Sequence, residues 1–401
     1  MHSHDEKMKL EKDLSDPGSL PEEAIQQAVA LMRTGRLHRY GEYGDTEPHA
    51  ALFEMEFAEY IGSRFAVGVN SGGCAIFLAL KVAGVGPGVP VLVNAFNLAP
   101  VPGAIEHAGG EAVLVEITDE FTIDLNDLRE KALSSGARIL LLTHMRGHIT
   151  DMDALMQICN ELGIKVIEDC AHTMGASWKD KFTGRFGELG CFSTQTFKHI
   201  NSGEGGILVT DNEDFAAQAV LYSGSYMLYG QHKAAPSQQV FDKWKGKIPN
   251  FSMRMSNLVA AVLRPQLREM AERGRQWNNN YRLLESRLNA INGVEVPARI
   301  ADEAFVASSI QFFVQGLDAA QMQQFADRVT AKGVAVKWFG RDEPMGYTSL
   351  YQHWGYLKKQ HLPDTDQILS TTCDMRIPLD LTEAHCDRIA EVIAQELSQI
   401  T

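Results

Sequence analysis

Residues 190–210 read GCFSTQTFKHINSGEGGILVT and contain one lysine, Lys198, between two apolar runs. The glycines of SGEGG come directly before the second run. This pattern predicts two short strands joined by a glycine-rich turn, with Lys198 on the loop between them. A lysine in this place can act as an amine nucleophile that forms a Schiff base, provided that burial or neighbours suppress its charge. It can equally be a surface lysine beside a hairpin, and this stretch alone does not separate the two interpretations.

The composition is that of an ordinary soluble globular protein. The chain has 401 residues, of which 45% are hydrophobic and 22% charged, so it is long enough for two domains. Its formal net charge of −14 argues against nucleic acid or an anionic membrane as the main partner, because both need a basic surface. The six cysteines form no CxxC pair and show no spacing typical of metal ligands. We therefore expect reduced core cysteines, a reducing compartment and no metal site.

The start of the chain, MHSHDEKMKLEKDLSDPGS, is polar and lacks the apolar segment of a signal peptide. No apolar run approaches the length that a membrane-spanning helix needs. These features predict a cytoplasmic protein.

From residue 48 onward, helical and strand-like periodicities alternate along the chain. Alternation of this kind, with continuously apolar strands, predicts an α/β fold with a mostly parallel sheet covered on both faces. In such sheets ligands bind beyond the carboxyl ends of the strands. Several chemically useful residues follow apolar strands, so we expect them to converge there: Asn70 to Gly73, Phe96, His144, Asp169 and the Lys198 loop. The predicted strands are 65–69, 89–93, 112–115, 139–143 and 165–169, and the predicted helices are 48–61, 98–108, 125–134 and 152–162.

The small residues Ser71, Gly72 and Gly73 lie between a predicted strand and a predicted helix. This arrangement places free backbone N–H groups and the positive end of a helix dipole at one point, which suits a phosphate ester. Many α/β proteins make the same turn for packing reasons alone, so the sequence leaves both interpretations open.

Asp169 ends a predicted buried strand, in the motif VIEDCAHTMGA. A buried acid needs a partner, or its pKa rises until it is neutral. A pyridinium N–H would satisfy it and keep the ring protonated, and a helix N-cap role is the equally weighted alternative. His172, three positions further on, either hydrogen-bonds a ring hydroxyl or is a satisfied core histidine.

Together these motifs make the chain resemble the pyridoxal-phosphate sugar aminotransferases of the DegT/StrS type. The similarity extends from about Gly35 to the C-terminal LDLTEAHCDRIAEVI. It implies the aspartate-aminotransferase fold, working as a homodimer with shared active sites. We expect an N-terminal helical segment (1–34), a large cofactor-binding domain (35–276) and a small C-terminal α/β domain (277–401). The motifs that carry the resemblance are SGG at 71–73, NAFNLAP around Phe96, HMRGHITDMD at 144–153, EDCAHTMGA at 168–176 and FSTQTFKHINSGEGG at 192–206.

The resemblance implies roles for four residues around the cofactor ring. Lys198 would form the internal aldimine and move the proton between cofactor and substrate. Asp169 would hold the pyridine nitrogen, and His172 would lie near the phenolic oxygen. Phe96 would stack on the face of the ring.

The resemblance also implies that Gly72, Gly73 and Ser193 hold the cofactor phosphate. Two departures bear on this assignment. The family usually has SGT where this chain has SGG, so a threonine hydroxyl is missing. Residues 250–254 read NFSMR where the family tends to have GFNYR. Ser252 therefore replaces an asparagine that often binds the partner's cofactor phosphate, and the shorter serine either loses that contact or makes it through water.

The segment KWFGRDEPMGYTSLYQHWGYLKKQ is rich in aromatic residues. Aromatic rings can stack on a sugar or base, and Arg341 can meet a carboxylate or phosphate. Packing of the small domain is an equally weighted explanation. The residues concerned are Trp338, Arg341, Tyr347, Tyr351 and Trp354.

The function that the resemblance implies first is amino transfer from glutamate or glutamine to a keto sugar, with a ping-pong mechanism and pyridoxal 5′-phosphate as cofactor. A nucleotide-linked sugar is the first acceptor expected, but a sugar acid or a cyclitol also fits. Two alternatives stay open at this point. One is a sugar dehydratase, although members with that activity carry histidine where this chain has Lys198, and His199 lies next to it. The other is a regulatory protein that binds the cofactor without turnover.

Overall fold

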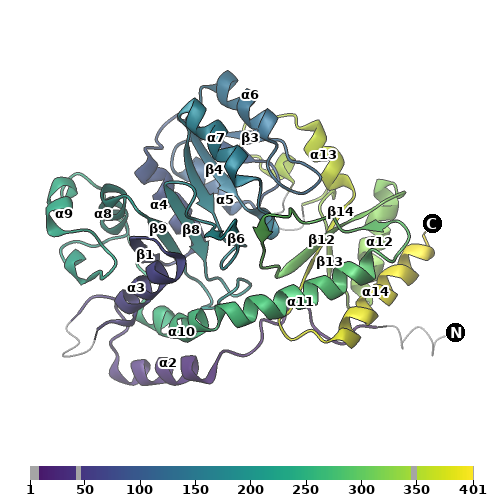
Figure 1. Ribbon diagram of the computed structural model, residues 1–401, viewed down its shortest axis with the longest axis horizontal. Helices are drawn as coiled ribbons and strands as arrows, with labels where there is room; N and C mark the ends of the chain where they lie inside the picture. The colour runs from purple at the N-terminus through teal and green to yellow at the C-terminus, as the bar shows by residue number, and fades with distance from the viewer. Residues whose placement is uncertain (1–8, 42–46, 345–349, 401) are drawn as a thin grey trace.

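The computed structural model describes residues 9–41, 47–344 and 350–400. Its centre is a seven-stranded sheet in the order β1-β9-β8-β5-β4-β2-β3 (Figure 1). Neighbouring strands from β8 to β3 pair in parallel, whereas β9 is antiparallel to both of its neighbours. The strands are β1 (Phe65–Val69), β2 (Pro90–Asn94), β3 (Glu111–Val115), β4 (Ile139–Thr143), β5 (Lys165–Asp169), β8 (Leu189–Ser193) and β9 (Gly206–Thr210).

Helices cover both faces of this sheet, which explains why most residues of its strands are apolar and buried. Every residue of β1, β4, β8 and β9 is buried. On one face, α4 (Gly72–Ala83), α5 (Pro100–His107) and α8 (Glu213–Tyr222) share an apolar cluster with the sheet. The opposite face packs against α6 (Leu125–Ser135) and α7 (Met152–Leu162), and against α3 (His49–Ile61) and α10 (Asn257–Arg268).

A second, four-stranded antiparallel sheet lies toward the C-terminal end of the chain, in the order β10-β12-β14-β13 (Figure 1). The helices α12 (Ala319–Ala331) and α14 (Glu383–Ser398) pack with it in one apolar cluster. Leu10 and Leu14 of the N-terminal segment belong to the same cluster, and the Leu10 N–H donates to the Lys332 carbonyl. Its strands are β10 (Val294–Glu295), β12 (Ser309–Val314), β13 (Val336–Trp338) and β14 (Thr372–Arg376).

The remaining elements connect these two sheets or flank them. A small sheet has the order β11-β6-β7, and short 3₁₀ turns occur at Met145–Gly147 (η2), Tyr229–Gln231 (η3) and Tyr351–His353 (η4). No described helix is long and apolar enough to cross a lipid bilayer. The other bounds are α2 (Glu22–Thr34), α9 (Gln238–Trp244), α11 (Met270–Leu288), α13 (Pro363–Ser370), β6 (Ser177–Trp178), β7 (Lys181–Phe182) and β11 (Glu303–Ala304).

The structure confirms the predicted α/β fold with its mostly parallel sheet. The strands predicted at 65–69, 139–143 and 165–169 have the predicted bounds, and the loop between β8 and β9 carries Lys198. The division into three parts stays a prediction, and α11 continues across the boundary proposed at residue 276.

The aromatic segment after β13 contributes to packing. Trp338, Tyr351 and Trp354 are buried, and Arg341 pairs with Asp327 at 2.9 Å. Tyr347 lies outside the described residues. The side chains that the structure describes in this segment therefore support the packing explanation for it.

Candidate active site

The carboxyl ends of the central strands surround a cavity of about 300 Å³. Its walls come from the loops after β1, β2, β4, β5 and β8, which are distant in sequence but meet at one edge of the sheet. A volume in this range suits a small cofactor or substrate. Residues that line it include Gly72, Asp169, His172, Ser193 and Lys198.

Lys198 occupies the loop between β8 and β9 and is partly buried. Burial, reinforced by the positive charge of Arg146, lowers the pKa of Lys198 from 10.5 to about 7. The Asp169 carboxylate opposes this shift without cancelling it. A large fraction of the amine is therefore uncharged near neutral pH, which is the form that attacks a carbonyl.

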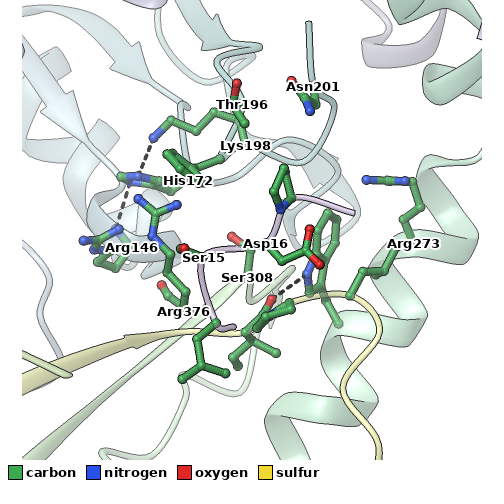
Figure 2. A pocket seen from close by; sticks show the side chains of 18 residues that line it. Ser15, Asp16, Arg146, His172, Thr196, Lys198, Asn201, Arg273, Ser308 and Arg376 are labelled. Atoms are coloured by element: carbon green, nitrogen blue, oxygen red, sulfur yellow. Dashed lines mark hydrogen bonds between the residues drawn. The ribbon is translucent and has the colours of Figure 1, made fainter. Parts of the chain in front are cut away.

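His172 contacts Lys198 with its Nε2 atom, 2.6 Å from the lysine Nζ (Figure 2). The Arg146 backbone N–H donates to His172 Nδ1 at 3.2 Å, so Nδ1 acts as an acceptor and carries no proton. Burial and the nearby cations keep the His172 pKa well below 6.5, so the ring is neutral and its proton is on Nε2. His172 can therefore donate this proton to the uncharged Lys198 amine, or to an oxygen placed beside it.

Asp169 ends β5 and is 3% exposed. Its Oδ1 accepts the Ala171 N–H at 3.1 Å. Burial raises the pKa of Asp169, and the hydrogen bond from Ala171 and the charge of Lys198 counteract part of this rise. A cationic donor such as a pyridinium N–H would relieve the cost of burying the carboxylate.

The first turn of α4 forms a cradle beside the end of β8. Ser71 caps the helix by accepting the Cys74 N–H at 3.1 Å, and the N–H groups of the first turn have no acceptor within the helix. A Cβ on Gly72 would lie 2.7 Å from Ser193 Cβ, so only glycine permits this approach. The nearest atom to a Cβ on Gly73 is Ser71 Oγ at 3.9 Å. The cradle thus presents N–H groups to the cavity next to the Ser193 hydroxyl.

The structure brings six of the eight predicted cofactor-binding residues to this cavity: Gly72, Gly73, Asp169, His172, Ser193 and Lys198. Phe96 is fully buried instead, and its ring centroid lies 4.9 Å from that of Phe339. Leu98, two positions further along the chain, lines the cavity. The expected stacking role of Phe96 is therefore not supported by its placement. Ser252 is exposed and accepts a hydrogen bond from Arg254 at 3.2 Å.

The neighbouring residue His199 is distinguished from Lys198 by its environment. It is 1% exposed, contacts the Val306 carbonyl through Nε2 at 3.3 Å and meets the Trp277 ring edge-on. Lys198, not His199, is the residue that lines the cavity.

Arg146 and Arg376 were not identified from the sequence as site residues. Arg146 follows β4 within HMRGH and has a left-handed backbone with φ 56°, and Arg376 ends β14. Arg146 lies in η2 after a strand of the central sheet, whereas Arg376 ends a strand of the second sheet, so local sequence pattern could not predict that they approach each other.

A second cluster of titratable groups lies deeper, where His144, Glu168 and Cys170 offer atoms within 4.8 Å of one another. The Glu168 carboxylate already accepts N–H groups from Gly184, Phe186 and Gly187 at 2.7–2.8 Å. This acid therefore anchors the loop before β8.

The donor set of the large cavity fits pyridoxal 5′-phosphate. It offers an amine for the aldehyde, a buried acid for the ring nitrogen, a neutral histidine N–H for the ring oxygen, and a cradle of N–H groups for the phosphate. These four features come from Lys198, Asp169, His172 and the first turn of α4, which all line the same cavity.

Comparison with known proteins gives a consistent picture. The model of the DegT/DnrJ/EryC1/StrS aminotransferase family matches residues 19–394. The spore coat polysaccharide biosynthesis protein SpsC of Bacillus subtilis is 32% identical over 63% of this chain and 64% of its own length. The L-glutamine:2-deoxy-scyllo-inosose aminotransferase of Streptoalloteichus tenebrarius is 28% identical over 74% of this chain and 73% of its own. The crystal structure of 3-amino-5-hydroxybenzoic acid synthase superposes with a TM-score of 0.83 at 25% identity, covering 97% of this chain and all of that one.

Proposed function

The chain belongs to the DegT/DnrJ/EryC1/StrS aminotransferase family, whose cofactor is pyridoxal 5′-phosphate, and from this premise we propose that it aminates a keto sugar in amino-sugar biosynthesis. The proposed donor is glutamate or glutamine. The first acceptor to test is a nucleotide-linked keto sugar, with a sugar acid and a cyclitol as the comparison set. The name of the Streptoalloteichus relative includes both glutamine and a cyclitol ketone, which supports this choice of donor and acceptors.

One observation carries the proposal: Lys198 and Asp169 line the same cavity from different strand ends. An amine that is partly uncharged near pH 7 and a buried acid across one small cavity are the two groups that an aminotransferase needs to hold its cofactor. The cradle at Gly72 lines the same cavity, which supports a phosphate-binding role for it.

Bound there, pyridoxal phosphate supplies a reactive aldehyde and a ring that accepts electrons. The Asp169 carboxylate would accept a hydrogen bond from the ring nitrogen and keep that nitrogen protonated. The His172 Nε2–H would donate to the ring oxygen and hold the orientation of the ring. The Lys198 amine, which is partly uncharged near pH 7, would serve as the general base and acid that moves a proton at the substrate carbon. Donor product leaves before the acceptor enters, which gives ping-pong kinetics.

The position of Lys198 supports amino transfer over the two alternatives. A dehydratase of this family would place histidine at the catalytic position, but His199 is buried away from the cavity. A regulatory protein without turnover would have no need for a lysine whose pKa is lowered to about 7.

We also propose that the protein works as a homodimer with shared active sites. Large apolar side chains beside Ser252 support this, because Tyr226, Met227 and Phe251 are 68%, 76% and 66% exposed. Such exposure in one region of a chain is typical of a surface that another protein covers. Sedimentation equilibrium would test it, with a dimer expected and a monomer at micromolar concentration contradicting it.

The function itself is tested by half-reactions. Purified protein loaded with the cofactor is mixed with L-glutamate or L-glutamine, and loss of the aldehyde-form absorbance is followed. The amine form is then mixed with a panel of keto sugars, and return of that absorbance identifies the acceptor. Failure of every amino acid to convert the cofactor would overturn the proposal.

A further inference from the structure

Lys198 also lines a second, smaller cavity. Its volume is about 60 Å³, and Lys198 and His172 line it as well as the large cavity. Figure 2 shows Arg146 and Arg376 next to His172 in this second cavity, which also receives the N-terminal segment at Ser15 and Asp16. Lys198 therefore borders both the proposed cofactor site and a compact recess lined by arginines.

Arg146 is held rigidly in this recess. Its Nη2 atom lies 2.7 Å from Asp374 Oδ2, and the two side chains are 12% and 5% exposed. The other oxygen of Asp374 accepts the Gln311 Nε2–H at 2.7 Å. Arg146 Nε is buried and has no hydrogen-bond partner among the described residues. One acid thus fixes Arg146 but leaves one of its donors unused.

Arg376, unlike Arg146, is not paired with an acid among the described residues. Its guanidinium carbon lies 3.6 Å from the centroid of the Phe197 ring, which fixes the plane of the group and leaves its edge for hydrogen bonds. Within the part of the chain that the structure describes, the Arg376 guanidinium forms no ion pair and donates no hydrogen bond. Burial and the charge of Arg146 lower its pKa, as expected for two cations forced together.

The charges around the recess do not balance. Arg146, Arg273 and Arg376 line the recess with Lys198, whereas Asp374, the buried acid beside them, is already committed to Arg146 and Gln311. Arg273 lies against the Trp277 ring and donates from Nε to the His199 carbonyl at 3.2 Å. Asp16 also lines the recess, but it accepts the Gly18 N–H at 2.9 Å and contacts Lys12 at 3.3 Å. Clustered guanidinium groups that lack a counter-charge favour an anion, and a planar carboxylate matches their geometry.

We propose that Arg376, assisted by Arg146, binds a substrate carboxylate that lies close to the carbon at which the amino group is transferred. The recess is too small for a nucleotide, and the phosphate cradle at Gly72 belongs to the other cavity. Donor and acceptor use the same site in turn, so this carboxylate comes from the amino-acid donor or from a sugar-acid acceptor. The inference rests on the proposed function for its substrates, but not for the existence of the anion site.

The first test needs no turnover. Apoprotein is titrated with glutarate, a dicarboxylate that has no amino group, and the pKa of Lys198 is measured from the rate at which its peptide is acetylated as pH is varied. A carboxylate held beside Lys198 stabilises the ammonium form, so we expect glutarate to raise the Lys198 pKa by about 1 unit. Arg376→Met should abolish this response, Arg376→Lys should retain part of it, and the exposed control Arg275→Met should leave it intact.

The second test separates the two sources of the carboxylate. If the donor supplies it, Arg376→Met lowers kcat/KM for cofactor conversion by L-glutamate by about 10- to 100-fold, while 4-aminobutyrate, which lacks the α-carboxylate, changes less than about 2-fold. If the acceptor supplies it, the loss appears with sugar acids in the reverse half-reaction, and L-glutamate is unaffected.

The possible failures are distinguishable. If no amino acid converts the cofactor of the wild-type enzyme, the proposed function is refuted, but the glutarate titration still tests the recess. If glutarate leaves the Lys198 pKa unchanged, or shifts it equally in Arg376→Met, the carboxylate site is refuted. Equal loss with charged and uncharged substrates in Arg376→Met would also overturn it, because that result shows a merely structural role.

Discussion

Replacing Gly72 with alanine tests the cradle at the start of α4 most sharply. The new Cβ would lie 2.7 Å from Ser193 Cβ, 3.0 Å from Ser193 Oγ and 3.3 Å from Ser193 Cα. Carbon atoms in contact prefer a separation of about 3.5–4.0 Å, so either the helix or β8 must move. Overpacking of this kind costs about 1–3 kcal/mol.

The adjacent residue provides a matched control. A Cβ on Gly73 meets no atom closer than Ser71 Oγ at 3.9 Å, and its backbone is helical. Gly73→Ala should therefore gain up to about 1 kcal/mol from the higher helix propensity of alanine. Two identical chemical changes at neighbouring positions are thus expected to have opposite effects on the free energy of unfolding.

Urea unfolding of the two apoproteins, followed by fluorescence and compared at a common slope, measures this difference. The midpoint of Gly72→Ala should fall below that of the wild type, and the midpoint of Gly73→Ala should equal or exceed it. Movement of α4 away from Ser193 should also weaken cofactor binding by at least about 10-fold, the effect of losing one charge-assisted hydrogen bond. A Gly72→Ala protein as stable as Gly73→Ala, with unchanged cofactor affinity, would refute the reasoning.

Three further predictions concern Lys198 and the buried ion pair of Glu54. In the apoprotein, the rate of Lys198 acetylation should rise with a midpoint at about pH 7, because the lowered pKa makes the neutral amine available there. A rise centred near pH 10.5 would contradict this. Lys198→Ala should lower kcat by at least roughly 10²-fold through loss of the proton-transfer group, measured in the half-reaction with L-glutamate. Glu54→Gln should destabilise the protein by about 3–5 kcal/mol because it removes the carboxylate that pairs with buried Arg39 at 2.7 Å, whereas the exposed control Glu272→Gln should cost less than about 0.5 kcal/mol. Burial opposes ionisation of Glu54, but the charges of Arg39 and His232 outweigh it and lower the Glu54 pKa from 4.5 to about 2. The stabilisation that ionised Glu54 contributes is therefore complete above about pH 4.5 and is lost as pH falls through about 2. Acid unfolding of the wild type and of Glu54→Gln should show this difference.

The parts of the site that lie next to buried strands were predictable from the sequence. Lys198, Asp169 and Gly72 each lie at or directly after such a strand, and the carboxyl ends of parallel strands must meet at one edge. Local pattern was therefore sufficient to predict that these residues converge, although not which atoms would touch.

Phe96 shows the limit of this reasoning. Asn94 fixes the loop after β2 by donating to the Phe96 and Thr143 carbonyls at 3.2 and 3.1 Å, and the Asn97 side chain reaches Thr143 Oγ1 at 2.9 Å. These bonds turn Phe96 into an apolar cluster with Phe339. Side-chain direction in an irregular loop depends on such contacts and not on sequence spacing.

Arg376 was unpredictable for a different reason. Its significance comes from β14, which carries it to Phe197 and toward Arg146, and that packing joins segments more than a hundred residues apart. Asp374, two positions earlier, supplies the acid that holds Arg146. Only the packing of the second sheet against the strand ends of the first reveals this relation.

We propose that Lys198 is the residue that carries the cofactor. Borohydride reduction of the holoenzyme fixes pyridoxal phosphate on that lysine, and mass spectrometry of the peptides locates the label. We expect the label on Lys198 alone. Lys337 is the informative alternative, because burial and Arg146 lower its pKa to about 8. Recovery of the label on Lys337, or on no single lysine, would contradict the account.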